Sequence, residues 1–242
     1  MLQAIDHVVI LVNNLEQAAS DYRTLGFNVV PGGTHTGGAS HNVLVSFADG
    51  TYLELIAFTH AATEHTWWPY TATGEGLIDF ALLPSDIATD LDTARNRGLA
   101  LDGPFPGGRL RPDGTRIEWQ TGRSPTRDLP FFCADVTPRS LRVPHGDAWQ
   151  HPNGAQGIAA LTIAVQDVAA STARYQALLG TSNKSGFLLG SAVIQLASGE
   201  QAAARIATRG EGPLALAIRV TPGSATGPLD LGLTHGVQIE LV

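Results

Sequence analysis

A tight turn followed by a strand in which polar and apolar residues alternate recurs in this chain and requires a repeated β structure. The phrase Asp-Gly-Thr-Tyr-Leu-Glu-Leu occupies residues 49–55, Asp-Gly-Thr-Arg-Ile-Glu-Trp occupies residues 113–119, and Gly-Val-Gln-Ile-Glu-Leu occupies residues 236–241. Asp-Gly supplies the positive backbone dihedrals of a tight hairpin, and the residues after it alternate with the two-residue period of a strand. The repeat predicts a fold built from similar β units.

Each copy also places one glutamate on the polar face of its strand, namely Glu54, Glu118 and Glu240. An unpaired buried charge is costly, so carboxylates aimed repeatedly at one side of a sheet indicate water, a metal ion or a ligand on that side. A strand with one solvated face explains any single copy equally well. The three glutamates are therefore candidate ligands, with a solvated strand face as the alternative.

The segments around the first hairpin predict a βαβββ module. A β-branched strand at residues 5–12 precedes a helix that ends at Gly26, and a second strand follows at residues 27–30. Pro31-Gly32-Gly33 breaks this strand, and two further strands flank the turn at Asp49-Gly50.

The same order returns from about residues 77, 158 and 214, and the last copy is shortened. In the third copy, a hairpin with strands at residues 194–196 and 203–207 matches the hairpin that carries Glu54. We therefore predict an α+β fold of four tandem βαβββ modules that form two half-barrel domains.

The predicted domain boundaries follow the composition. The first domain covers residues 1–136 and contains the first two modules, and the second, degenerate domain covers residues 157–242. The segment 137–156 is rich in proline and glycine, which predicts a linker between them.

Composition excludes several classes of function. The chain has 242 residues, of which 43% are hydrophobic and 15% charged, as in ordinary globular proteins. A net charge of -7 without a basic stripe argues against nucleic acid and anionic membranes as partners. The single cysteine, Cys133, lies in an apolar run and indicates a structural thiol in a reducing compartment. With no signal peptide and no run of transmembrane length, we expect a cytoplasmic protein that acts on a small molecule.

The tandem modules resemble the vicinal oxygen chelate superfamily, whose fold occurs in glyoxalase I and the extradiol dioxygenases. The resemblance is greatest to its glyoxalase-like domain branch and covers nearly the whole chain. It rests on Ile-Asp-His-Val-Val at residues 5–9, on the segments 31–35 and 40–42, and on Gly-Thr-Tyr-Leu-Glu-Leu at residues 50–55. Later matches are Arg-Pro-Asp-Gly at residues 111–114 with Trp119, and His-Pro-Asn-Gly-Ala at residues 151–155.

The resemblance implies a metal site, because each module of the superfamily can offer a histidine from its first strand and a glutamate from its last. The first module keeps both, as His7 and Glu54. Counting back from the helix-ending glycines, His7 corresponds to Asp79 and Ala160 in the next two modules. Glu54 corresponds in the same way to Glu118 and to an alanine near Ala203.

The pairing of the modules decides the rest of the implied ligand set. Glu118 completes it if the first two modules pair, and Glu240 completes it if the first module meets the fourth. Imidazole and carboxylate ligands suit a divalent ion such as Zn²⁺, Ni²⁺, Mn²⁺ or Fe²⁺. No nucleotide cofactor is indicated.

The segment between the second and third strands adds two more imidazoles. His35 or His41 can act as a general base near neutral pH, and Asn42 can orient a substrate. A flexible polar loop is the alternative.

Other candidates for contact with a substrate are scattered along the chain. Trp67 and Trp68 cannot both face one core, so we expect one of them at a lid, a dimer contact or the surface. His151 precedes a Pro-Asn-Gly turn that fixes its direction or forms an ordinary turn. The cluster of Arg109, Arg111 and Arg116 can hold a substrate carboxylate, or keep the surface soluble.

We predict a small-molecule enzyme, a divalent-metal-assisted lyase or isomerase acting on an oxygenated organic substrate, with a homodimer as one possible assembly. Its ion would stabilise a developing oxyanion while Glu54 or a histidine moves a proton. A dioxygenase is less favoured, because Ala160 stands where its histidine would be. The alternative is a metal-free protein that sequesters a small ligand, as antibiotic-binding members of the superfamily do, with Trp67, Trp68 and Trp119 lining the cleft.

Overall fold

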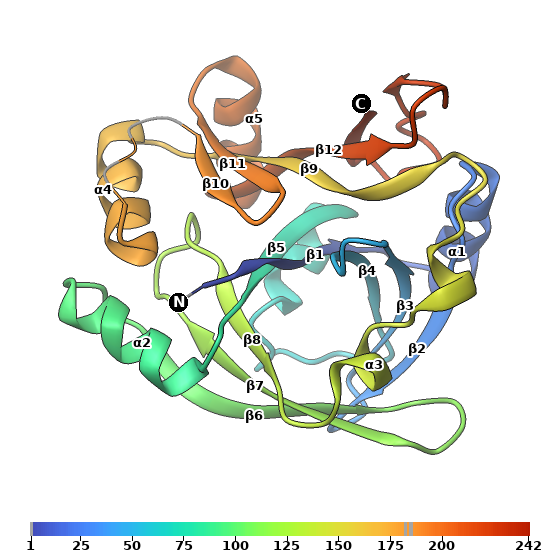
Figure 1. Ribbon diagram of the computed structural model, residues 1–242, viewed down its shortest axis with the longest axis horizontal. Coiled ribbons are helices and arrows are strands. Elements are labelled where there is room, and N and C mark those ends of the chain that lie inside the picture. Colours follow the sequence, from blue (N-terminus) through green and yellow to red (C-terminus); the bar gives the residue numbers. More distant parts are fainter. Residues whose placement is uncertain (1, 182, 184–185) are drawn as a thin grey trace.

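The protein, seen in a computed structural model that describes residues 2–181, 183 and 186–242, consists of a barrel with a second sheet packed on it (Figure 1). The first module contains β1 (Ala4–Leu11), α1 (Leu15–Thr24), β2 (Val30–His35), β3 (Ser40–Ser46) and β4 (Tyr52–Phe58). After the 3-10 helix η1 (Trp68–Thr73), the second module contains β5 (Gly76–Leu83), α2 (Ile87–Asn96), β6 (Asp102–Leu110), β7 (Arg116–Arg123) and β8 (Phe131–Asp135).

The short helices α3 (Arg139–Arg142) and η2 (Gly146–Trp149) lead out of the barrel. The third module contains β9 (Ala155–Ala164), α4 (Val168–Leu179), β10 (Phe187–Leu189), β11 (Ala192–Ala197) and α5 (Glu200–Arg209). The fourth contains only strands, β12 (Gly212–Val220), β13 (Gly227–Pro228) and β14 (Gln238–Leu241).

Eight strands of the described chain close into the barrel, in the order β1-β4-β3-β2-β6-β7-β8-β5. The first module therefore pairs with the second, and β1 and β5 run antiparallel where the two modules meet. In each module the first strand lies parallel to the last, β1 beside β4 and β5 beside β8. The predicted α+β fold of tandem βαβββ modules is confirmed.

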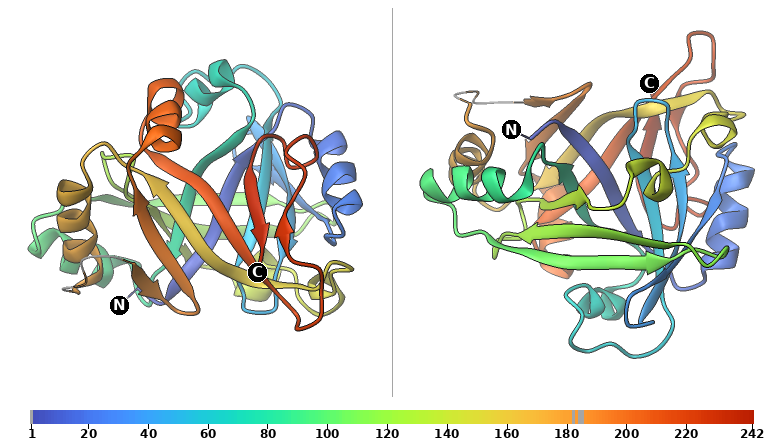
Figure 2. Two further views of the ribbon diagram at one scale, coloured as in Figure 1. Left: turned by 90° about the horizontal axis from the view of Figure 1, so that it is seen from above. Right: turned by 60° about the horizontal axis from the view of Figure 1, so that its bottom comes forward.

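The third and fourth modules form an open sheet from six strands of the described chain, in the order β10-β11-β9-β12-β14-β13. Figure 2 shows this sheet lying across one side of the barrel. Its inner face packs on the outer face of β1 and β5, and the two faces share one hydrophobic core. Leu161 and Ile163 on β9 and Val8 and Phe80 on the barrel belong to that core and are fully buried.

Two local predictions were wrong. Residues 203–207 belong to the helix α5 and not to a strand, because Glu-Gln-Ala-Ala-Ala-Arg is a run of strong helix formers. Pro31-Gly32-Gly33 does not end a strand but lies within β2, at a shift in its register with β3. A Cβ on Gly32 would come within 2.0 Å of the side-chain oxygen of Asn42, so this strand needs a glycine there.

The predicted boundaries at residues 136 and 157 stay a prediction. The last barrel strand ends at Asp135, and β9 begins at Ala155.

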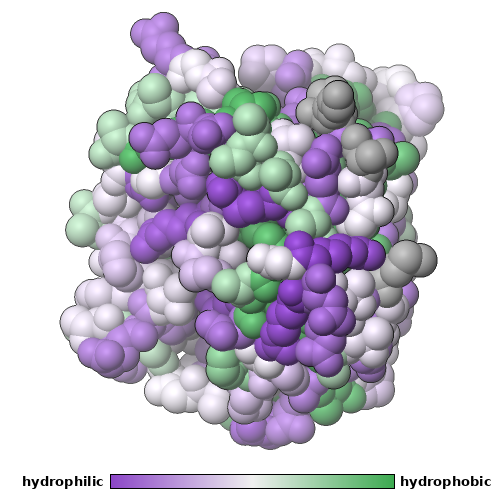
Figure 3. Space-filling model, turned by 90° about the vertical axis from the view of Figure 1, so that its left-hand side faces the viewer, coloured by the Kyte–Doolittle hydropathy of each residue, from purple (hydrophilic) through white to green (hydrophobic). Residues whose placement is uncertain are grey.

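The surface near α2 and α4 is mostly hydrophilic with apolar residues between (Figure 3), and Leu178, Leu179 and Leu188 line a groove there. Among the helices of the described chain, none is long and apolar enough to cross a membrane.

We expect Leu161→Ala to destabilise the whole molecule, because its side chain is fully buried between the barrel and the second sheet. The loss in the free energy of unfolding should be about 2–5 kcal/mol, measured by urea denaturation. Leu188→Ala, at a site that is 67% exposed, should change it by less than about 0.5 kcal/mol. Two separate transitions, with only one of them shifted, would contradict a shared core.

Candidate functional site

A cavity of about 290 Å³ opens into the barrel. Its walls are side chains from β1, β2, β4, β6, β7, β8 and α3, together with His65 and Trp67 from the segment before η1. Successive residues of a strand face opposite sides of a sheet, so His7 on β1 and Glu54 on β4 point inward with alternate residues of their strands. We call this space the barrel cavity.

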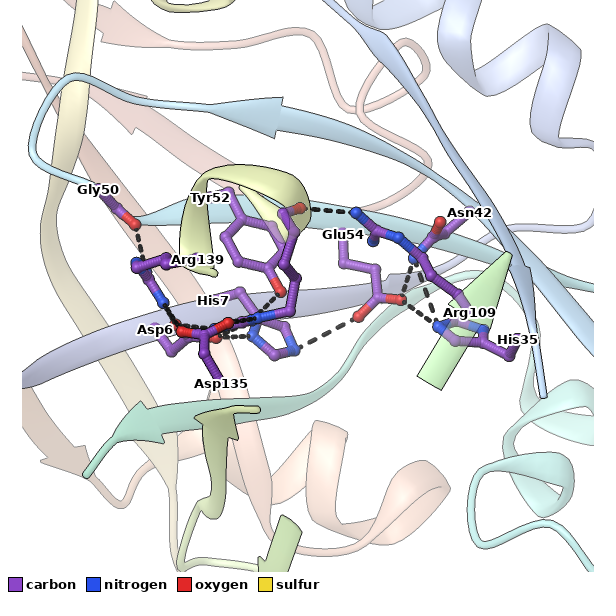
Figure 4. A network of polar contacts seen from close by, with 11 residues as sticks. Asp6, His7, His35, Asn42, Gly50, Tyr52, Glu54, Arg109, Asp135 and Arg139 are labelled. Atoms are coloured by element: carbon purple, nitrogen blue, oxygen red, sulfur yellow. Dashed lines mark hydrogen bonds and ion pairs between the residues drawn. The ribbon is translucent and has the colours of Figure 1, made fainter. Parts of the chain in front are cut away.

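Glu54 is the centre of a buried polar cluster in the barrel cavity (Figure 4). Its Oε2 lies 3.3 Å from Nε2 of His7, and its Oε1 lies 3.3 Å from Nε2 of His35. The side-chain amide of Asn42 donates a hydrogen bond of 2.6 Å to the same Oε1. Four residues from β1, β2, β3 and β4 thus meet at one carboxylate.

The neighbours of Glu54 keep it ionised. Burial by itself raises the pKa of this carboxyl, but the hydrogen bonds and charges of His35 and His7 outweigh burial and hold the pKa well below its usual value. Glu54 therefore carries a negative charge inside the barrel cavity, where both imidazoles face it.

His7 is fixed in direction by Asp6. Its Nδ1 lies 2.6 Å from Oδ2 of Asp6, which leaves Nε2 facing Glu54. Neighbouring residues of a regular strand point to opposite faces, but the pairing of β1 with β5 shifts between Ile5 and His7, so both side chains reach the same region. The ring also stacks on Tyr52 at 4.6 Å. Burial lowers the pKa of His7, but hydrogen bonds to Asp6 and Glu54 outweigh it and raise the pKa above 6.5.

Asp6 is itself held by two arginines of α3. Arg142 donates from Nη1 to Oδ2 at 2.7 Å and from Nη2 to Oδ1 at 3.0 Å, and Arg139 donates to Oδ1 at 2.5 Å. Arg142 also bonds Asp135 through Nε and Nη2, and the hydroxyl of Tyr52 through Nη1. The network connects α3, β1, β4 and β8, so it fixes the position of Asp6, which orients His7.

His35 is oriented in the same manner as His7. Its Nδ1 lies 2.9 Å from the hydroxyl of Ser40, and its Nε2 faces Glu54. The Oδ1 of Asn42 is buried and has no hydrogen-bond partner among the described residues. Two imidazole Nε2 atoms and one carboxylate therefore converge, each imidazole with its Nδ1 held by a second polar group.

The residue types of this cluster suit a divalent ion, but their ligand atoms do not all lie within 4.8 Å of one another, so the side chains would have to draw together to coordinate a single ion. Two histidines and one carboxylate are the ligands that borderline ions such as Fe²⁺, Mn²⁺ and Zn²⁺ prefer, and a second polar group on each Nδ1 is the usual support for such ligands. Among the described residues, the group whose ligand atoms do lie within 4.8 Å of one another is Asp6, His7 and Cys133. It fits less well, because Asp6 is engaged by both arginines and burial raises the pKa of Cys133 to about 12.

The structure does not bring Glu118 or Glu240 to this cluster. Glu118 lies on the outward face of β7, where it pairs with Arg116 at 2.8 Å and both side chains are largely exposed. Glu240 lies exposed on β14 of the second sheet. Both residues were predicted as metal ligands and Arg116 as a substrate contact, and those roles stay predictions without support from the geometry.

The register of the parallel strands gives the structural counterparts of Glu54. Glu54 lies beside Val9 on β1, and in the second module Phe131 lies beside Ala81 on β5 in the equivalent place. In the third module the equivalent residue is Gln195, not Ala203. Asp79, the counterpart of His7, faces inward but accepts a hydrogen bond of 2.8 Å from the indole of Trp67.

The other predicted site residues divide between the cavity and the outside. Trp67 and Trp119 line the barrel cavity, whereas Trp68 packs on Phe58 with ring centroids 5.0 Å apart and does not line it. His41 is on the face of β3 opposite to Asn42.

His151 lies away from the barrel cavity and connects the segment 137–156 to the barrel. Its Nδ1 accepts from the backbone of Asn28 at 2.9 Å, and its Nε2 lies 3.0 Å from the carbonyl oxygen of Ser46. Burial lowers its pKa, so the neutral ring donates from Nε2 to that carbonyl.

Several residues of the site were not predicted from the sequence. Asp6 is adjacent to His7 in the matched phrase, and this adjacency was a usable signal. Arg139 and Arg142 lie in the segment predicted as a linker, and no local pattern connects them with a strand more than a hundred residues earlier.

Comparison with known proteins agrees with this architecture. The family model described as glyoxalase-like domain matches residues 5–179, and the chain belongs to that family. A hypothetical protein from Staphylococcus aureus has a similar structure, with a TM-score of 0.75, 12% identity and 98% of each chain covered.

A mutant of 4-hydroxymandelate synthase from Streptomyces coelicolor matches with a TM-score of 0.65 and 13% identity, over 96% of this chain and 78% of that chain. No curated protein matches the sequence. The structural neighbours belong to the vicinal oxygen chelate superfamily, whose members include metal-dependent enzymes, and at these identities they show the fold alone.

We expect Arg142→Met to destabilise the protein strongly, because it leaves the buried carboxylate of Asp6 and the partly buried carboxylate of Asp135 without their main partner. The free energy of unfolding should fall by about 3–5 kcal/mol in urea denaturation. Arg116→Met breaks an exposed ion pair and should cost less than about 1 kcal/mol. Equal effects of the two substitutions would contradict the structural role of Arg142.

We also expect His7 to titrate above 6.5 in metal-free protein, because Asp6 and Glu54 stabilise its charged form. Since the folded-state pKa is raised, this stabilisation is fully present below the unfolded-state value of about 6.5 and is lost as pH rises through the folded-state pKa. Asp6→Asn should lower the pKa of His7, measured by NMR titration of its ring protons in EDTA. Glu118→Gln, on the outside of β7, should leave it unchanged.

Proposed function

We propose that this protein is a small-molecule enzyme whose barrel cavity holds a divalent ion at His7, His35 and Glu54. The observation that carries the proposal is the convergence of two imidazole Nε2 atoms on the two oxygens of one buried carboxylate, each at 3.3 Å. The site lies in a cavity large enough for a small organic molecule beside the ion.

The chain's own residues would prepare the site in three ways. Asp6 and Ser40 hold the two histidines so that each presents Nε2. His35 and His7 hold the pKa of Glu54 low and keep it ionised, and Asn42 donates to it, which suits an ion ligand better than a proton carrier. When bound, a divalent ion polarises a carbonyl or hydroxyl oxygen and stabilises negative charge that develops on it.

His65 supplies a hydrogen-bond donor in the same cavity. Burial, with the charge of Arg123, lowers its pKa, so the ring is neutral near pH 7. Its Nδ1 accepts a hydrogen bond of 3.1 Å from the backbone of Trp67, and the proton of the neutral ring therefore lies on Nε2. A group that donates to a developing oxyanion supports a lyase or isomerase, the reaction class that we propose.

A metal-free binding protein is the second candidate, and one observation favours it. The oxygens of Glu54 already have His7, His35 and Asn42 as partners, so this carboxylate is satisfied without an ion. Trp67 and Trp119 would then contact a ligand that is bound without turnover.

We retain the cytoplasmic location and the homodimer as proposals, the first in agreement with a free, buried Cys133.

Metal loading tests the proposal. Protein stripped with EDTA and dialysed against Mn²⁺, Zn²⁺, Ni²⁺ or anaerobic Fe²⁺ should retain about one ion per chain, measured by elemental analysis. His7→Ala, His35→Ala and Glu54→Gln should each reduce this content to near zero, because each removes a ligand. Glu118→Gln and Glu240→Gln are matched controls that should load as the wild type does. A wild type that retains no ion under these conditions would leave the metal-free binding protein as the conclusion.

A further inference from the structure

Arg109 lies buried in the wall of the barrel cavity with most of its hydrogen-bonding capacity unused. It is 4% exposed and lies on β6, directly opposite His35 of β2. Its Nη2 donates to the carbonyl oxygen of Arg142 at 2.6 Å. Its Nε is buried and has no hydrogen-bond partner in the described part of the chain. A guanidinium has five N–H donors, so most of the donors of Arg109 are left for something else.

The charge of Arg109 also lacks a partner. Within residues 2–181, 183 and 186–242, no carboxylate oxygen lies within 4 Å of its guanidinium, whereas the equally buried Arg142 pairs with Asp6 and Asp135. Glu54 is near enough for its charge to favour the Arg109 cation, but its oxygens are engaged by His7, His35 and Asn42. A buried cation without an anion is costly, and burial accordingly lowers the pKa of Arg109.

The surroundings of Arg109 define what would neutralise it. A second cation, Arg123, lines the same cavity, with its guanidinium 5.7 Å from the ring centre of Trp67 and 5.5 Å from that of Phe131. The described residues give Arg123 no ion pair either. Trp67, Trp119 and Phe131 make the remaining wall aromatic. The cavity thus offers cationic donors on one part and apolar surface on another.

We propose that the barrel cavity takes a small organic carboxylate, with its carboxylate held by Arg109 and its apolar part against Trp119 and Phe131. A planar guanidinium pairs with a carboxylate through two parallel hydrogen bonds, which suits the unused donors of Arg109. A cavity of about 290 Å³ restricts the ligand to a small molecule. This assignment rests on the proposed function, because it names the substrate class of the same site.

Fluorescence titration with matched probes tests the assignment. Trp67 and Trp119 line the cavity, so a bound probe should quench tryptophan emission. In EDTA, where no ion can bind the probe, benzoate should bind at least about tenfold more tightly than benzamide, which has the same shape without the charge. Arg109→Gln should abolish this preference, and Arg109→Lys, which keeps the charge but not the two parallel bonds, should reduce it. Arg116→Gln, on the outside of β7, should leave it intact.

The outcomes separate the assignment from the proposed function. Equal affinities of the wild type for benzoate and benzamide would overturn the assignment. An unchanged preference for benzoate in Arg109→Lys would also overturn it. If Arg109→Gln does not fold, the result for Arg109→Lys decides the question. Tighter binding of phenyl phosphate than of benzoate would overturn the choice of a carboxylate. An Arg109-dependent preference in a protein that loads no ion would support the assignment and sink the proposed enzyme. A protein that loads an ion but binds benzoate and benzamide equally well would support the proposed enzyme and overturn the assignment of a carboxylate.

Discussion

The buried ion pair of Asp6 with Arg142 is the interaction on which the rest of the site depends. Removing two charges from water costs several kcal/mol each, and only well-directed hydrogen bonds offset that cost. Here Asp6 receives bonds from Arg142 and Arg139 and also bonds the ring of His7, while Asp135 bonds the remaining nitrogens of Arg142. The pair connects the first strand of the chain with the segment that leaves the barrel, so the barrel must be closed before His7 is directed at Glu54.

The two modules of the barrel have the same fold but contribute different chemistry. The first contributes His7, His35, Asn42 and Glu54, which meet around one carboxylate. The second has Phe131 where the first has Glu54, and it adds cations and aromatic rings to the same cavity. The carboxylate cluster therefore belongs to the first module and the cations Arg109 and Arg123 to the second, and both modules line the cavity.

Much of the fold was predictable because its signals are local. The Asp-Gly turns, the alternating strands and the caps of the helices depend on neighbouring residues, and Asn14 caps α1 as its sequence suggests, by accepting from the backbone of Gln17. The strand at residues 203–207 was wrong because short apolar alternation fits a helix face as well as a strand.

The site was predictable only in part. His7 and Glu54 lie together as the family resemblance implied, and His35 joins them. The role of Glu118 was inferred by matching hairpins, but the Asp113-Gly114 turn joins β6 to β7 and so corresponds to the connection before β3, not to the one before β4. The contacts of Arg109 and Arg142 depend on strand order and register across the closed barrel, which no local pattern specifies.

The phenylalanine at position 131 has a consequence for how the protein can change over evolutionary time. Because the second module carries none of the residues that meet at Glu54, substitutions there can alter the shape and charge of the ligand's surroundings while the cluster of the first module stays as it is. The first copy of the duplicated unit then holds the polar cluster, and the second sets the walls around it. A chain that differs from this one only in those walls would keep the cluster and change the shape and charge of the space beside it.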